Sequence, residues 1–582
     1  MNALLLTTLL AFAQDDAADK PTGFAGNAAG TAPQVEIPWN RLYDYPELLA
    51  HFDRLVAKWP ERMSMEIIGH STGSREMRVY TLHNPATGPD ASKPAMWVDG
   101  NVHGNEVQGG EAVLYMAAYL LENYDTNERV RELLDRSTFY LCPSVNPDGR
   151  ASWFNDAHTA SSSRSGTMPI DSDRDGAADE DGPDDLDGDG HITQMRKYVP
   201  GEGTHRLNPD DPRIMERVPV NELGIKGDWI MLGSEGIDND GDGRKNEDGL
   251  GGYDMNRAWP SFWQPGHVQF GAGPYPLYWP ETRCIGRFIY EHANIAGVQS
   301  FHNSGGMILR GPGAQGFGSY PGRDLRVFDE LGKDGEKMLP FYRYMIIWSD
   351  LYTVFGGFAT WTYEGLGIIS FTNELWTGNR NNPDSSRSTE GRQEFDDMLL
   401  MGNGYIPWHA APEPHPLYGD IEIGGFKKDV GRVPPSFLIE EMLHRNAVFT
   451  LRHAESMPEV SIQSIEISEV ADGLKAVDVT FKNNRLIPTR TARAAGQKIG
   501  QPDAFTLAGE GIEVLAGGFR SDDFRPERIA LAEREPARLL RENGIGSRAE
   551  LKVRWYVRGS GSAVVTWSGE KALDVSQAVE IE

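Results

Sequence analysis

Segment 94–123 constrains the fold of this 582-residue chain most strongly, because it joins an apolar strand to a helix through a short polar turn. Residues 95–98 are apolar, and His103 and Glu106 lie in the turn that follows. An imidazole and a carboxylate three residues apart at such a junction can bind one divalent ion from the same side. Catalytic zinc commonly takes three protein ligands of this type and leaves a fourth position for water. The segment therefore supplies two ligands and requires a third.

The pattern His-x-x-Glu is weak evidence by itself, because two residue types at one spacing recur by chance. Two further polar residues follow apolar strands elsewhere in the chain, namely His302 and Glu374. A lone histidine at a strand end is usually a hydrogen-bonded structural group, but beside His103 and Glu106 it becomes the missing third ligand. Three ligands and a free carboxylate are the set that metal-assisted hydrolysis requires. The metal lowers the pKa of its water, and the carboxylate takes the proton.

Strands that alternate with helices predict an α/β fold with a mixed, largely parallel central sheet flanked by helices. Ligands of such sheets bind beyond the carboxyl ends of the strands, which is where the candidate residues stand. A chain of this length is expected to hold more than one domain. We expect a catalytic domain over residues 41–455, interrupted by an insertion at 155–250. Short alternating strands predict an all-β sandwich over residues 456–582.

The formal net charge is −29. Segments 171–190 and 238–248 hold 15 acidic and three basic side chains, and so account for 12 of those negative charges. A nucleic-acid partner is excluded, because phosphate binding requires a basic face. The remaining excess is a generally acidic surface, which favours solubility.

The acidic segments repeat one pattern. Residues 170–182 read I-D-S-D-R-D-G-A-A-D-E-D-G, residues 237–249 read I-D-N-D-G-D-G-R-K-N-E-D-G, and residues 185–192 read D-L-D-G-D-G-H-I. Oxygen side chains at alternate positions followed by glycine let a loop curl around a hard cation, as in calcium-binding loops. The first and third loops lack a glutamate at the twelfth position, so they are not complete EF-hands, and a solvated acidic linker is the alternative. We expect structural calcium that shapes an insertion with little apolar content. The candidate ligands are Asp171, Asp173, Asp175, Asp185, Asp187, Asp189, Asp238, Asp240 and Asp242.

The N-terminal residues resemble an export signal. Residues 4–10 are mostly apolar and A-F-A follows at 11–13, which predicts a signal peptide over 1–13, although no Lys or Arg stands near its start. The protein is therefore expected to be secreted or periplasmic. Residues 14–40 are rich in Ala, Gly and Pro and predict a flexible lead-in. No other apolar run is long enough to span a bilayer. Cys142 and Cys284 could form one disulfide or remain two buried thiols.

Ordered motifs over residues 45–400 resemble those of the zinc carboxypeptidase family, the carboxypeptidase A-like metallopeptidases. The motifs are H-G-N-E at 103–106, N-P-D-G at 146–149, M-R-K at 195–197, D-M-N-R at 254–257, S-F-H-N at 300–303, Tyr352 with a Gly-Gly pair and Trp361 beyond it, and S-F-T-N-E-L at 370–375.

The resemblance implies roles for particular residues. It implies that zinc is bound by His103, Glu106 and His302, and that Glu374 is the general base and then the general acid. It further implies that Arg196 stabilises the oxyanion of the scissile carbonyl.

The resemblance also implies a substrate clamp. Asn256 and Arg257 would hold the terminal carboxylate of the substrate, which a guanidinium fork matches in bidentate fashion, and Tyr352 would close over the substrate. There are two departures from the family. Asn303-Ser304 stands where many members have Ser-Tyr, and Ala359 stands where the side-chain pocket is decided. The preferred terminal residue therefore does not follow from the sequence.

These observations predict an exported zinc metallocarboxypeptidase that acts on the C-termini of peptides or proteins. One alternative is an amidohydrolase of related fold that acts on peptidoglycan stem peptides or acyl-amino acids. Another is a calcium-stabilised binding or adhesion protein with a vestigial site, against which the intact Glu374 argues. The C-terminal sandwich could contact cell wall or carbohydrate, or shield an edge of the enzyme.

Overall fold

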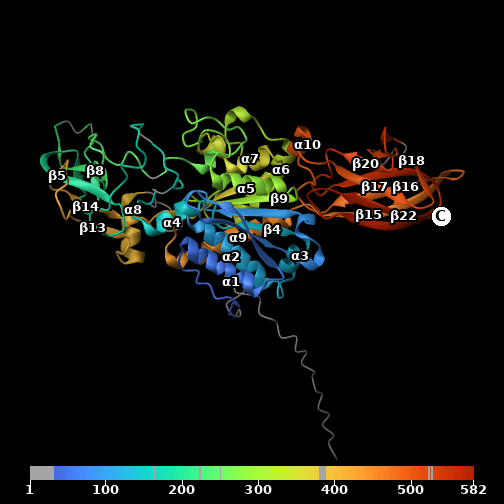
Figure 1. Ribbon diagram of the computed structural model, residues 1–582, viewed down its shortest axis with the longest axis horizontal. Coiled ribbons are helices and arrows are strands. Elements are labelled where there is room, and N and C mark those ends of the chain that lie inside the picture. Colours follow the sequence, from blue (N-terminus) through green and yellow to red (C-terminus); the bar gives the residue numbers. More distant parts are fainter. Residues whose placement is uncertain are drawn as a thin grey trace, which may run out of the picture.

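The computed structural model describes residues 32–582 except 162–163, 172–173, 220, 222–223, 250, 379–387, 522–524 and 526–527. The expected signal peptide over residues 1–13, most of the expected lead-in and the candidate ligand Asp173 lie outside the described residues. Figure 1 shows a central α/β part, a smaller β-sheet part at one end, and a β-sandwich, drawn in red, at the other end.

The central sheet has eight strands within the described residues, in the order β1-β2-β4-β3-β9-β12-β10-β11. The pairs β3–β4, β3–β9, β9–β12 and β10–β11 are parallel, whereas β1–β2, β2–β4 and β10–β12 are antiparallel. The predicted mixed, largely parallel sheet is thus confirmed. The strands are β1 Met63–His70, β2 Glu76–Leu82, β3 Ala95–Gly100, β4 Thr138–Cys142, β9 Ile295–Asn303, β10 Met307–Arg310, β11 Arg343–Ile346 and β12 Ile369–Leu375.

Helices cover both faces of the central sheet (Figure 1). Helices α1, α2 and α9 contribute to the core that contains Met96, whereas α5 and α7 contribute to the core that contains Trp97. These neighbours on β3 enter different cores because side chains alternate along a strand. A strand buried on both faces reads as a continuous apolar run, as residues 95–98 do. The helices are α1 Tyr45–Lys58, α2 Gln108–Asn123, α3 Glu128–Arg136, α4 Pro147–Asn155, α5 Pro280–Glu291, α6 Gly322–Met338, α7 Phe358–Glu364, α8 Thr389–Phe395, α9 Ile439–Glu455 and α10 Ala492–Gln497.

Strands β3, β9 and β12 lie side by side and end at one edge of the sheet. On β12, Glu374 is in register with His302 on β9. At the end of β3, a Cβ on Gly100 would lie 2.4 Å from the backbone carbon of Gly109, so only glycine lets α2 start this close to the strand. The turn between β3 and α2 therefore lies at the same edge as the ends of β9 and β12.

A second sheet joins two distant segments, with the order β13-β14-β5-β8-β6-β7. Strands β5 to β8 belong to the expected insertion at 155–250, whereas β13 and β14 come from a segment more than 170 residues later. Met195, Ile421 and Ile423 form a small core there. The insertion is thus stabilised partly by a sheet, which the acidic composition alone did not predict. The strands are β5 Gln194–Gly203, β6 His205–Leu207, β7 Met215–Arg217, β8 Gly227–Ser234, β13 Tyr405–Ala410 and β14 Glu422–Phe426.

The C-terminal residues form the predicted β-sandwich. One sheet has the order β15-β16-β21-β18-β19 and the other has the order β20-β17-β22-β23. Trp555 and Trp567 belong to the core between them. The sandwich contacts the α/β part, where the Lys571 ammonium donates to the carbonyl of Ala293 at 3.0 Å. The strands are β15 Val460–Ala471, β16 Leu474–Asn483, β17 Asp503–Gly509, β18 Ile512–Arg520, β19 Ile529–Leu531, β20 Arg538–Arg541, β21 Glu550–Gly559, β22 Gly561–Ser568 and β23 Val575–Ile581.

The last residues of the expected flexible lead-in are packed. Val35 and Ile37 are buried in the main core, and Trp39 packs against it. The amide of Val35 donates to Oε1 of Glu122 at 2.9 Å. The expected boundary at residue 40 is therefore wrong, because apolar residues among the prolines anchor this segment to the core.

Both cysteines are free and buried. Burial raises the pKa of the Cys142 and Cys284 thiols, which keeps them protonated. Of the two alternatives left open by the sequence, two buried thiols is correct.

His453, on α9, gives the folded protein a specific sensitivity to acid. It is fully buried, and neither ring nitrogen has a hydrogen-bond partner among the described residues. Burial lowers its pKa from 6.5 to about 3. Below pH 6.5 the His453 side chain binds a proton in the unfolded chain but not in the folded chain. The free energy of unfolding therefore has its full value above pH 6.5 and decreases as the pH falls toward 3.

We expect His453→Leu to remove this part of the acid sensitivity. At about pH 4.5 the wild-type protein should have lost about 3 kcal/mol through this one group. Thermal unfolding of both proteins at pH 7.5 and 4.5 measures the difference. Equal losses of stability in the two proteins would contradict the expectation.

Candidate active site

His103, Glu106 and His302 converge at the edge of the central sheet. Nδ1 of His103 lies 2.9 Å from Oε1 of Glu106, and Nδ1 of His302 lies 2.9 Å from Oε2 of the same carboxylate. Each residue is only 2% exposed. One ligand atom from each lies within 4.8 Å of the other two. Nitrogen and oxygen atoms at about 3 Å from one another suit a tetrahedral ion with bonds of about 2 Å.

The hydrogen bonding of His103 also favours a cation at this point. Nε2 of His103 lies 2.9 Å from Oδ1 of Asp254, and this contact favours the tautomer with its proton on Nε2. Nδ1 is then a bare lone pair that faces Glu106, and it has no hydrogen-bond partner among the described residues. A divalent cation satisfies this lone pair and the carboxylate together. The donor set of two imidazoles and one carboxylate therefore fits zinc.

Asp254 lies behind the cluster and is the first residue of the D-M-N-R motif. Burial acts to raise the pKa of Asp254, but Arg257, His103 and Arg164 outweigh burial and hold that pKa well below its usual value. Asp254 thus remains a carboxylate and orients the imidazole of His103. Sequence reasoning assigned it no role, although it adjoins two candidate residues in the same motif.

Arg164 brings one guanidinium to the cluster. Its Nη1 lies 3.1 Å from Oε1 of Glu106, and its Nη2 lies 3.1 Å from Oδ2 of Asp254. Its guanidinium also interacts electrostatically with Tyr352. Arg164 stands in the run S-S-S-R-S-G, which carries no recognisable motif, so the sequence did not single it out.

Arg196 lies in the second sheet, away from the cluster. On β5 it donates from Nε to Glu422 at 2.8 Å, and its guanidinium stacks over Trp229 at 4.1 Å and Trp408 at 4.3 Å. The structure therefore does not bring Arg196 to the cluster, where an oxyanion donor is required. Strand β5 belongs to the insertion, so the M-R-K motif lies in the second sheet and not at the edge of the central sheet.

Glu374 is at the end of β12, beside the cluster. Burial first, and the charge of Glu106 second, raise the pKa of Glu374 to about 7, while His302, Arg164 and Arg432 act to lower it. A carboxylate that exchanges protons near neutral pH has the property that a general base and acid requires.

The predicted substrate clamp lies on the Asp254 side of the cluster. Arg257 is 8% exposed, its Nη2 is 3.6 Å from Oδ2 of Asp254, and its Nη1 donates to the carbonyl of Asn256 at 2.9 Å. The side-chain oxygen of Asn256 accepts from the amide of Phe358 at 2.8 Å. Tyr352 is 57% exposed, so it lies at the surface of the protein.

Arg432 is a second guanidinium at the cluster that sequence reasoning missed. Its Nη2 lies 3.4 Å from Oε1 of Glu106 and donates to the carbonyl of Asn303 at 2.7 Å. Arg432 follows β14, in a segment to which the sequence motifs do not extend, so no local pattern indicates it.

The acidic loops share one backbone geometry. A glycine amide five residues on donates to the first aspartate of each loop, from Gly176 to Asp171 at 3.1 Å, from Gly190 to Asp185 at 2.8 Å and from Gly243 to Asp238 at 3.0 Å. Three groups of acidic residues each lie close enough together to share a cation. They are Asp175, Glu180 and Asp240; Asp185, Asp187 and Glu235; and Asp238, Asp240 and Asp242. Among the described residues, the predicted ligands Asp171 and Asp189 are in none of these groups, and Asp240 joins the first loop to the third.

Known protein families match parts of this chain. A family model described as zinc carboxypeptidase matches residues 48–180 and 232–397, and a domain of unknown function matches residues 459–580. Carboxypeptidase B of Astacus astacus is 32% identical over 134 residues, which cover 23% of this chain and 42% of that protein. Carboxypeptidase D of Homo sapiens is 31% identical over 107 residues, which cover 18% of this chain and 8% of that protein.

The chain thus spans less than half the length of these curated relatives. Among solved structures, carboxypeptidase A from Helicoverpa armigera has a TM-score of 0.42 and 17% identity, over 73% of this chain and 77% of that one. The matched zinc carboxypeptidase segments contain His103, Glu106, His302 and Glu374 and make up more than half of the sequence. The chain belongs to the zinc carboxypeptidase family.

Proposed function

We propose that this protein hydrolyses the C-terminal peptide bond of peptides or proteins with one zinc ion held by His103, Glu106 and His302. The observation that carries the proposal is the convergence of these three buried side chains on one point, with Glu374 beside them. Zinc supplies a water of lowered pKa and polarises the scissile carbonyl.

The residues around the ion have separate tasks. Glu374 takes a proton from the attacking water and delivers it to the leaving amine. Arg164 offers a guanidinium to the oxygen of the scissile carbonyl as negative charge develops there. Asn256 and Arg257 hold the terminal carboxylate, which restricts the reaction to the last peptide bond. Tyr352, at the surface near Arg164, covers the bound substrate.

A library of peptides, each made with a free and with an amidated C-terminus, tests this function by mass spectrometry. We expect single-residue loss from free C-termini only, and we expect a zinc chelator to abolish it. Cleavage of amidated peptides would remove Arg257 as the carboxylate clamp and would favour an amidohydrolase. No cleavage by zinc-loaded protein would direct the test to stem peptides and acyl-amino acids, whereas zinc content far below one would favour a binding protein.

Export remains part of the proposal. It is supported by the signal-like residues 1–13, which would direct the protein to the periplasm or the medium. Among the described residues, no helix combines the length and the hydrophobicity needed to cross a bilayer. A contact of the sandwich with cell wall or carbohydrate rests on its position at one end of the molecule (Figure 1).

We further infer that the acidic loops hold calcium. Asp181 is completely buried, and its Oδ2 has no hydrogen-bond partner among the described residues. The two carboxylate oxygens of Glu247, with which Asp181 interacts, also lack one there. Buried carboxylate oxygens that lack donors and lie near one another are costly unless a cation lies between them. Asp181 belongs to the first loop and Glu247 to the third, so a cation here would tie the two loops together.

These loops connect directly to the active site. Oδ1 of Asp179 accepts from the amide of Gly251 at 3.2 Å, and the hydroxyl of Ser165 donates to the carbonyl of Tyr253. Ser165 follows Arg164, and Tyr253 precedes Asp254, so ordering of the loops also orders the Arg164–Asp254 pair.

Calcium is therefore expected to stabilise the zinc-loaded protein. At a calcium concentration 100-fold above Kd the gain is about 3 kcal/mol for each site. Asp238→Asn should reduce the rise in melting temperature that calcium produces, whereas Asp472→Asn, at an exposed turn of the sandwich, should not. Calorimetry with and without calcium measures both. A melting temperature that does not respond to calcium would contradict the inference.

A further inference from the structure

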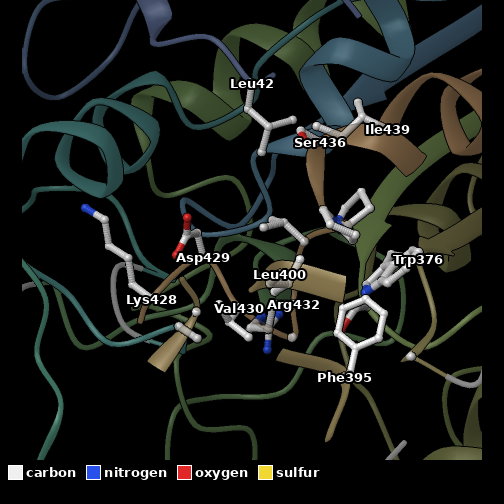
Figure 2. A pocket seen from close by; sticks show the side chains of 18 of the residues that line it. Leu42, Trp376, Phe395, Leu400, Lys428, Asp429, Val430, Arg432, Ser436 and Ile439 are labelled. Atoms are coloured by element: carbon white, nitrogen blue, oxygen red, sulfur yellow. The ribbon is translucent and has the colours of Figure 1, made fainter. Parts of the chain in front are cut away.

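A cavity of about 990 Å³ opens beside the cluster. Part of its wall follows directly after the strands that carry His302 and Glu374, and comprises Ser304, Gly305, Trp376 and Thr377. Other parts of its wall come from α8 and from residues 428–437, which include Arg432. Figure 2 shows Arg432 in the middle of this cavity, between Val430 and Phe395.

The cavity is cationic in an otherwise acidic protein. Its described lining includes Arg41, Arg392, Lys428 and Arg432, and Asp429 is the single acid among them. The whole chain carries a net charge of −29, so this local excess of positive charge is opposite in sign to the rest. A charged recess with walls of low dielectric concentrates ligands of the opposite charge.

Arg41 and Lys428 are engaged by groups outside the cluster, and Nη2 of Arg432 is engaged by Glu106 and the carbonyl of Asn303. Arg41 donates to Glu47 at 2.9 Å, and Lys428 donates to the carbonyls of Trp153 and Asp156 at 2.8 and 2.9 Å. In Figure 2 the Lys428 ammonium accordingly points away from Arg432.

Arg392 and Arg432 are left with unused donors. The Nε of each is buried and has no hydrogen-bond partner among the described residues. The guanidinium of Arg392 lies over Phe426 at 4.0 Å, and no carboxylate pairs with it among those residues. A Cβ on Gly431 would lie 3.6 Å from Nη2 of Arg392, so this guanidinium is beside the backbone that carries Arg432. Buried donors of this kind favour a ligand that brings acceptors.

The direction of a bound peptide follows from the two sides of the cluster. Arg257, the proposed carboxylate clamp, contacts Asp254, which in turn contacts His103 of the cluster. Arg257 does not line the cavity. Arg432 lines the cavity and contacts Glu106 of the cluster. A peptide with its terminal carboxylate at Arg257 and its last peptide bond at the cluster would therefore extend its preceding residues into the cavity.

We propose that this cavity binds the substrate residues that precede the scissile bond and that Arg392 and Arg432 select a carboxylate side chain among them. The substrate class is then peptides with Asp or Glu at one of the three positions before the terminal residue. The inference rests on the proposed carboxypeptidase function, because that function sets the direction of the peptide.

Paired peptides test the selection. Each pair has the same free terminal residue and differs only by Glu or Gln at one of the three preceding positions. We expect kcat/KM for the Glu peptide to exceed that for the Gln peptide about tenfold at one position at low salt, the size expected for hydrogen bonds to a charged group. High salt should reduce the ratio.

Variants then assign the effect to the cavity. Arg392→Gln should bring the ratio toward one, Arg392→Lys should restore part of it, and Arg538→Gln on the exposed surface of β20 should leave it as in wild type. A ratio of one at all three positions, or an unchanged ratio in Arg392→Gln, would overturn the proposal.

If the protein cleaves neither peptide, the carboxypeptidase function fails. Fluorescence anisotropy of the same labelled peptides then decides, since equal binding of Glu and Gln peptides would overturn the cavity proposal as well.

Discussion

Glu374→Gln is expected to lower kcat by about 10³-fold while the protein keeps its zinc and its fold. The substitution preserves the size of the side chain and removes its ability to accept a proton. Because His103, Glu106 and His302 are untouched, the metal content should remain at one ion per chain.

Glu364→Gln provides the matched control. Glu364 is a buried glutamate whose pKa, like that of Glu374, is raised to about 7, but its carboxylate accepts from Ser261 and Tyr320 at 2.8 and 2.9 Å, away from the cluster. In Glu364→Gln the amide oxygen can accept from one of these hydroxyls and the amide NH2 can donate to the oxygen of the other, so activity should stay within about threefold of wild type once folding is verified. Equal losses in the two variants would show that burying an amide, and not losing the base, impairs the enzyme.

The pH profile gives a second reading of the same residue. The base must be deprotonated, so kcat/KM should fall on the acid side of the pKa of Glu374. Without a metal, burial and the charge of Glu106 raise that pKa to about 7. Zinc offsets the charge of Glu106, so the holoenzyme should lose activity at a pH below 7, and the residual activity of Glu374→Gln should lack this limb.

The convergence of His103, Glu106, His302 and Glu374 could be predicted from the sequence because each member has a local signature. His103 and Glu106 share one turn, and His302 and Glu374 each follow an apolar run that forms a buried strand. Parallel strands end at one edge, so three signals that are distant in sequence become adjacent in space. The alternation of short strands likewise predicted the sandwich.

The groups around the cluster could not be predicted because their partners are distant in sequence. Arg164 meets Asp254 across 90 residues, and Arg432 meets Glu106 across 326. Nothing within a few residues of either arginine indicates these contacts. The second sheet was missed for the same reason, since β5 pairs with β14 only after more than 200 intervening residues. For Arg196 the reverse holds. The local M-R-K motif indicated a place at the cluster, but the insertion places this residue in the second sheet.

Arg164→Gln is expected to lower kcat/KM by about 10² to 10³-fold, the range found when one donor to a developing oxyanion is removed. Arg164 is the arginine that contacts both Glu106 and Asp254, so its loss removes positive charge at the scissile carbonyl. Arg164→Lys should recover only part of the activity, because an ammonium does not reproduce the two-sided contact of the guanidinium.

Arg196→Gln is the decisive comparison, since it tests the residue indicated by the sequence motif against the one indicated by the structure. Arg196 pairs with Glu422 and stacks on Trp229 and Trp408, so its loss should destabilise the second sheet and leave kcat/KM within about threefold of wild type. Thermal unfolding and steady-state kinetics on both variants separate these effects. If Arg196→Gln loses activity as a folded protein and Arg164→Gln does not, the oxyanion donor is on the second sheet, and that sheet must move onto the cluster when substrate binds.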